Sequence, residues 1–137
     1  MGTTLGNNIK DKKRALVQKL FNRSVKVMNK EINLQDYQDE YAKNENRSLV
    51  VHIEDLGTYG FVIGGGQVRT LHEGDMMTTE MWMTMDEFIL IATGEEDLMD
   101  AFWAGRVIVD GKNWFRDLGI FSRVSQKNKF LFRRMKE

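Results

Sequence analysis

The sequence predicts a single α+β domain, on three observations. Residues 9–32 repeat apolar side chains at helical spacing, and residues 47–83 contain short stretches in which apolar and polar residues alternate. The helical period returns at Thr84 and continues, apart from one more strand-like stretch at 106–110. A chain of 137 residues with 42% apolar residues is long enough for one hydrophobic core but short for two.

The N-terminal stretch predicts one amphipathic helix over residues 9–32. Lysine and arginine side chains interleave with two adjacent apolar rows, which are Ile9, Leu16, Leu20 and Val27, and Val17, Phe21 and Met28. Residues 33–46 are polar, but Leu34, Tyr37 and Tyr41 recur at spacings of three and four. We therefore expect a short second helix there, followed by a loop.

The middle of the chain predicts a β-sheet. In residues 47–56 alternate positions fall on opposite faces, with Leu49, Val51 and Ile53 on one face and Val50, His52 and Glu54 on the other. Residues 57–74 predict two strands joined by the glycines 64–66, because glycine adopts the positive φ that a tight hairpin needs. Residues 78–85 predict a fourth strand. Together these stretches predict an antiparallel meander.

Two short helices should follow the fourth strand. Thr84 and Glu87 have the spacing of a capping box at the start of a helix that Gly94 ends. Thr93 and Glu96 have the same spacing and predict the start of the second helix.

The second of these helices should end at Gly105. A strand at 106–110 and a helix over 112–124 are expected to follow. We expect residues 1–137 to form a single domain, with a helix within 1–32 and a basic C-terminal end at 123–137.

Charge is distributed unevenly although the net charge is zero. Residues 1–34 hold eight basic and two acidic side chains, residues 35–105 hold three and fifteen, and residues 106–137 hold nine and three. Either the basic ends lie beside the acidic middle, or they form a basic face for an anionic membrane or partner. The chain has no zinc-ligand spacing and no aromatic and basic sheet signature, so we expect no nucleic-acid partner.

The composition also bears on location. Cysteine is absent, which excludes a disulfide framework and a thiolate site. The first residues contain no apolar segment typical of a secretory signal, and no apolar run approaches the length that spans a bilayer. We therefore expect a cytoplasmic protein.

The sequence offers no catalytic constellation. His52 and His72 fall in different strand-like stretches without metal-ligand spacing, so we expect structurally bonded or solvated histidines. The glycines 64–66 lie between two strands, whereas a phosphate-binding loop precedes a helix. Helix caps explain the acidic residues near 86 and 96. We expect no enzyme, no metal site and no cofactor.

The informative feature is an excess of apolar surface in the C-terminal half. In the helix near residue 100, apolar side chains cover an arc of about 200°, whereas a helix lying on a core needs a stripe of about 100°. Residues 88–92 are apolar all round, and the final helix carries Trp114, Phe115, Leu118, Phe121 and Val124. Three things can cover this surface: an ordinary core, a partner subunit, or an apolar ligand in a pocket. Nine methionines suit an adaptable interior, but they suit a plain core equally well.

The order of elements and several motifs resemble the sterol carrier protein type 2 domain, a sterol-binding and lipid-transfer family. The matching pieces are TM at 84–85, DEF at 86–88, TGE at 93–95, AFWAG at 101–105 and RVIVDG at 106–111. The similarity is best over residues 47–122. Lys112 departs from the family, which usually has Asp there, and the bulky Trp103 and Trp114 would narrow a tunnel.

This resemblance implies a mainly antiparallel five-stranded sheet with helices on one face and an apolar cavity between them. It implies non-catalytic binding of a fatty acid, acyl-CoA, phospholipid or sterol-like lipid by a monomer or homodimer. The alternative is a ligand-free scaffold or oligomerisation domain that accompanies another protein. Carried over from the family, the expected lining residues are Phe88, Ile91, Leu98, Phe102, Trp103, Trp114, Phe115, Leu118 and Phe121.

Overall fold

The computed structural model describes residues 3–32, 47–64, 67–112, 114–129 and 133–134. The expected helix within 33–46 lies outside these residues. The elements follow one another as α1 (Thr3–Ile32), β1 (Arg47–Ile53), β2 (Gly57–Gly64), β3 (Gln67–Thr70), β4 (Thr79–Met83), α2 (Met85–Ala92), α3 (Leu98–Trp103), β5 (Ile108–Gly111) and α4 (Trp114–Lys127).

The five strands form one sheet in the order β3-β2-β1-β4-β5. The pairings β1–β2, β2–β3 and β4–β5 are antiparallel, which confirms a mainly antiparallel sheet. The predicted four-strand meander is wrong at β4, which crosses to the far edge of β1 and pairs with it in parallel, with Leu49 opposite Thr79 and Ile53 opposite Met83. Alternation of side chains gives the face of a strand but not its neighbour or direction, so the sequence pattern did not reveal this crossover.

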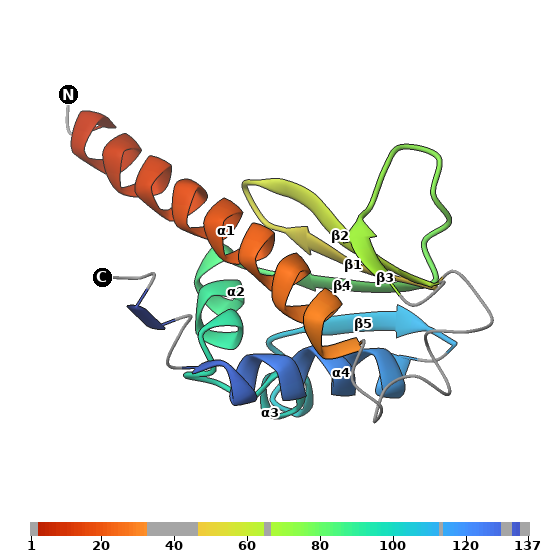
Figure 1. The fold of residues 1–137 in the computed structure, drawn as a ribbon. Coiled ribbons are helices and arrows are strands. Elements are labelled where there is room, and N and C mark those ends of the chain that lie inside the picture. Colours follow the sequence, from red (N-terminus) through yellow and green to blue (C-terminus); the bar gives the residue numbers. More distant parts are fainter. Residues whose placement is uncertain (1–2, 33–46, 65–66, 113, 130–132, 135–137) are drawn as a thin grey trace.

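One face of the sheet carries the core, as the alternation predicts. Leu49, Val51 and Ile53 of β1 belong to a single apolar cluster with Phe61 of β2 and Met81 of β4. The same cluster includes residues of all four helices, so α1, α2, α3 and α4 pack on this face (Figure 1). The helices thus cover one face of the sheet.

The opposite face is partly closed by the chain between β3 and β4. Leu71 packs on Gly60, where an added Cβ would lie 2.9 Å from the Leu71 Cβ. The hydroxyl of Ser48 donates to the carbonyl oxygen of Met76 at 2.7 Å, which holds this segment against the start of β1. Within the segment, hydrogen bonds from the Arg69 guanidinium and the backbone N–H of His72 hold the pKa of Asp75 well below its ordinary value.

The observed N-cap matches the predicted one for only one of the two short helices. Thr84 is the N-cap of α2 and its side chain accepts from the N–H of Glu87, as predicted. The second predicted box is wrong, because Thr93 ends α2 and Asp97 is the N-cap of α3. The Thr93 hydroxyl donates to the Ile89 carbonyl at 2.7 Å, so it completes the last turn of α2 and is not available to start α3.

The remaining boundaries differ by a few residues from those expected. Helix α1 begins at Thr3 and not near residue 9, and α4 runs to Lys127 and not to 124. The last strand begins at Ile108 and not at Arg106, because the backbone N–H of Arg106 donates to the carbonyl oxygen of Ala101 at the end of α3.

The pairing of β5 with β4 requires glycine at position 111. Gly111 has a φ of +150°, and an added Cβ would lie 2.7 Å from the Thr78 carbonyl oxygen and 2.8 Å from the Thr79 hydroxyl oxygen. We expect Gly111→Ala to lower the free energy of unfolding by about 2–4 kcal/mol, because strain and a clash add together. Urea denaturation measures this change.

The matched control is Gly119→Ala in α4, where nothing lies within 4 Å of the added Cβ. Alanine in a helix interior should raise the stability by about 0.5–1 kcal/mol. An equal effect of both substitutions would contradict the close approach at Gly111.

Candidate functional site

The space between the sheet and the helices brings together five of the nine predicted site residues. Phe88 and Ile91 of α2, Leu98 of α3, and Leu118 and Phe121 of α4 are all buried in the apolar cluster. They come from three helices and meet the inner face of the sheet. These five residues therefore share one apolar layer, and their expected role as the lining of a lipid tunnel stays a prediction.

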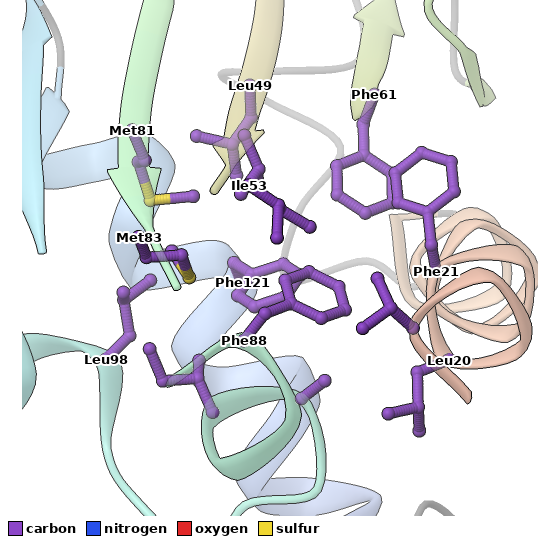
Figure 2. Packing of buried hydrophobic residues seen from close by; sticks show 14 of the residues in the cluster. Leu20, Phe21, Leu49, Ile53, Phe61, Met81, Met83, Phe88, Leu98 and Phe121 are labelled. Atoms are coloured by element: carbon purple, nitrogen blue, oxygen red, sulfur yellow. The ribbon is translucent and has the colours of Figure 1, made fainter. Parts of the chain in front are cut away.

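Aromatic rings connect the layers of this interior. The rings of Phe21 and Phe61 lie 4.7 Å apart, those of Phe61 and Phe121 5.8 Å, and those of Phe121 and Phe88 6.5 Å. Figure 2 shows Phe88 and Phe121 in the middle of the layer, with Leu98 and Met83 on one side and the Phe21–Phe61 pair on the other. A row of rings therefore joins α1, β2, α4 and α2.

A buried polar cluster fixes the start of α4 to the sheet. Asp117 is 2% exposed, and one of its carboxylate oxygens accepts from the Arg47 guanidinium at 3.1 Å and from the Thr79 hydroxyl at 2.5 Å. Arg47 begins β1 and Thr79 begins β4. This cluster therefore sets the position from which Leu118 and Phe121 enter the interior.

The other four predicted residues gather at the surface, where α3 ends and α4 begins. Trp103 is 72% exposed and Phe115 is 65% exposed, whereas Phe102 and Trp114 are half-buried. The ring of Phe102 lies 4.9 Å from that of Trp103 and 4.8 Å from that of Trp114, which in turn lies 5.6 Å from Phe115. These four rings, called the aromatic cluster below, form one continuous surface feature.

Among the described residues, two grooves open near the ends of β1 and β4, and the predicted site residues line neither of them. The larger, of about 520 Å³, is lined by His52, Ile53, Glu54, Gly57, Thr58, Trp82, Met83, Thr84, Gly105, Arg106 and Ile108. The smaller, of about 300 Å³, lies where α1 passes the start of α2 and is lined by Lys10, Lys13, Glu54, Asp55, Thr84, Met85 and Asp86. Each groove is lined in part by residues of the apolar cluster. Ile53 and Met83 line the larger groove, and Met85 lines the smaller one.

The larger groove holds residues that the sequence did not single out as a site. The His52 ring stacks on Trp82 at 5.1 Å, and its two nitrogens lie 2.8 Å from the Thr58 hydroxyl and 2.9 Å from a Glu80 oxygen. Thr58 and Trp82 are the cross-strand neighbours of His52, so the sheet register itself explains these contacts. Alternation already placed His52 on the face opposite to Leu49, Val51 and Ile53, but only the β1–β4 pairing places Trp82 beside it.

Contacts between the basic N-terminal helix and the acidic middle agree with the first reading of the charge pattern. Lys13 pairs with Asp86 at 3.0 Å, and the Arg14 guanidinium donates to the Asp55 carbonyl at 3.3 Å. Across the ranges that the structure describes, no group of three His, Asp or Glu side chains is placed to hold a metal ion. Nor does any described helix have the length and apolar character to cross a membrane.

The arrangement of sheet, helices and apolar interior agrees with a known family. A family model, the SCP-2 sterol transfer family, matches residues 25–113, which is more than half of the chain. The chain belongs to the SCP-2 sterol transfer family. This confirms the resemblance seen in the sequence. Proteins of this family bind and transfer lipids or sterols and are generally not catalysts.

Solved structures show the same SCP-2 fold. Palmitated SCP2L2 from Aedes aegypti has a TM-score of 0.54 at 9% identity, and the match covers 77% of this chain and 92% of that chain. Sterol carrier protein domain 2 of Helicoverpa armigera has a TM-score of 0.52 at 11% identity, with 78% and 88% covered. No curated protein matches this SCP-2 chain in sequence.

The interior and surface phenylalanines of α4 should differ sharply in their effect on stability. Phe121→Ala removes a ring that is 1% exposed, and we expect a loss of about 3–5 kcal/mol of unfolding free energy. Phe115→Ala, at 65% exposure, should change it by less than about 0.5 kcal/mol. Thermal or urea denaturation of both variants tests this, and equal losses would contradict the placement of the two rings.

The contribution of the polar cluster at the start of α4 to the free energy of unfolding should also be measurable. Asp117→Ala removes the acceptor for Arg47 and Thr79, and we expect unfolding free energy to fall by about 2–4 kcal/mol. The control Asp110→Ala changes an exposed carboxylate of β5 and should have little effect. Similar stability of the two variants would exclude a role for Asp117 in anchoring α4.

Proposed function

We propose that this chain is a non-catalytic lipid-binding domain that holds an apolar ligand between its sheet and its helices. The observation that carries this proposal is the apolar layer built by α2, α3 and α4 against the inner face of the sheet, in a chain of the SCP-2 family. Transfer of lipid between membranes is the natural consequence of reversible binding.

The five buried predicted residues form the proposed ligand site: Phe88, Ile91, Leu98, Leu118 and Phe121. They present only hydrocarbon, so the affinity for a lipid chain comes from transferring methylene groups out of water, at about 0.8 kcal/mol for each group buried. Phe102, Trp103, Trp114 and Phe115 form the outer end of the same wall, where α3 meets α4.

A ligand must replace contacts that the apolar side chains make with one another. Met81 and Met83 lie on the inner face of the sheet, with Met83 next to Leu98 (Figure 2), and Met85 begins α2. Methionine has an unbranched, flexible side chain that repacks at low cost. These three residues are therefore suited to make room for a chain that enters the interior.

The smaller groove offers a route for entry. It lies between α1 and the start of α2, and its wall includes Met85, which belongs to the apolar cluster. Lys10 and Lys13 stand beside Glu54, Asp55 and Asp86 at its rim, so the rim carries charges of both signs.

The test is direct detection of lipid and of its position. Native mass spectrometry of freshly purified full-length protein should show bound lipid, and the protein should take up a fluorescent fatty acid. Phe121→Leu, which alters the interior while keeping it apolar, should change the dissociation constant of that fatty acid by roughly threefold or more. Trp82→Ala in the larger groove should leave it unchanged.

The reverse pattern would move the ligand to the outer face of the sheet. If Trp82→Ala abolished uptake of the fatty acid while Phe121→Leu had no effect, the larger groove would be the binding site. Repeated purification without lipid, together with no uptake of the fatty acid, would refute lipid binding.

The alternative function is a ligand-free scaffold or oligomerisation domain. The observation that favours it is the exposed aromatic cluster, since exposed rings are common at protein interfaces. Size-exclusion chromatography separates the two functions. A stable dimer that carries no lipid and that Trp103→Ala dissociates would support the scaffold.

A further inference from the structure

We propose that the aromatic cluster is a membrane-docking surface, on which Trp103 and Phe115 enter the interfacial layer of a phospholipid bilayer. This inference rests on the proposed function, because a carrier of lipid must meet the membrane with which it exchanges its ligand. It adds which surface makes that contact and which force holds it there.

The two exposed rings are held by an ordered framework. Phe102 and Trp114 are half-buried and each touches one of the exposed rings, at 4.9 and 5.6 Å between ring centres. Below them, Leu98 begins α3 and is fully buried, and Asp117 in the first turn of α4 is held by Arg47 and Thr79. The rings therefore project from two fixed helix ends, so little order has to be gained on docking.

The exposed area favours a bilayer over a second copy of the chain. A buried aromatic side chain removes about 150–250 Å² from water, so Trp103 and Phe115, at 72% and 65% exposure, offer roughly 250–300 Å² together. A stable protein interface needs about 800 Å² from each partner. A membrane interface has no such threshold, and tryptophan is enriched there because its ring is apolar while its N–H remains hydrated.

The charges beside the cluster indicate that apolar insertion, and not attraction to anionic lipid, drives the contact. The exposed charged residues on α3 and between Ile108 and Arg116 include Asp100, Asp110, Lys112 and Arg116, two of each sign. Arg106 is also exposed, but it lies against the carboxylates of Glu87 and Glu96. Binding should therefore be nearly as strong on neutral as on anionic vesicles.

Docking through the lysine-rich N-terminal part of α1 would show a different dependence on lipid charge. Lys10 and Lys12 are exposed there, and Figure 1 shows this end of α1 on the opposite side of the molecule from α3 and α4. Docking through α1 would depend strongly on anionic lipid and on salt. The lipid dependence thus distinguishes the two surfaces.

The experiment measures binding of the full chain to phosphatidylcholine vesicles, with and without phosphatidylserine. The double variant Trp103→Ala/Phe115→Ala should bind about tenfold or more weakly to both, because it removes the two inserting rings. The control Met76→Ala/Met77→Ala removes two exposed apolar side chains from the segment between β3 and β4 and should bind as the unchanged protein does.

A second measurement does not depend on losing binding. In Trp82→Phe/Trp114→Phe, Trp103 is the single tryptophan, and its emission should shift to the blue on vesicles and be quenched by brominated phosphatidylcholine. Absence of quenching in a folded protein that still binds vesicles would overturn the proposal. So would unchanged vesicle binding by the alanine double variant, or a dimer that buries Trp103.

Uptake of the fluorescent fatty acid in the absence of vesicles separates this inference from the proposed function. If the double variant and the unchanged protein both take up fatty acid and both bind vesicles equally, docking by the cluster is wrong and lipid binding stands. If neither takes up fatty acid but vesicle binding requires the rings, the membrane surface stands and the interior lipid site is wrong.

Discussion

The structure depends on the apolar contact between one face of a mixed sheet and the helices that cover it. The row of rings from Phe21 through Phe61 and Phe121 to Phe88 joins elements that are far apart in the sequence. Each pair contributes area burial together with a specific ring geometry. Because the lipid site proposed here lies in this same layer, stability and ligand binding draw on one set of side chains, and a change to either affects the other.

Two polar devices keep the apolar layer in register. Asp117 ties the start of α4 to Arg47 and Thr79 at one end of the sheet. At the other end of the sheet, the Arg106 guanidinium forms ion pairs with the carboxylates of Glu87 and Glu96. Such pairs add little to stability beyond what apolar residues would give, but they fix which way the helices sit. The exposed aromatic cluster is the external end of the same α3–α4 wall.

The sequence predicted the fold to a considerable extent, and five of its nine predicted site residues share the apolar interior. Periodicity located most elements, and the motifs from Thr84 to Gly111 indicated the family, because capping and close approach require particular residues there. The pairing of β1 with β4 was not predicted, because alternation of side chains does not reveal which strands lie next to each other. The same limit hid the stacking of His52 on Trp82. Helical spacing also put Phe115 and Phe121 on the same apolar side of the last helix, although only the three-dimensional packing decides which ring is covered.

The crossover between β1 and β4 has a consequence for synthesis of the chain. The central strand β1 can pair with β2 as soon as the hairpin emerges from the ribosome, but its other edge has no partner until residues 79–83 follow. During that interval the edge of LVVHI exposes unpaired backbone groups on an apolar strand, a template for pairing with other nascent chains. The order of elements along the chain therefore makes this protein most vulnerable to aggregation while it is still being made.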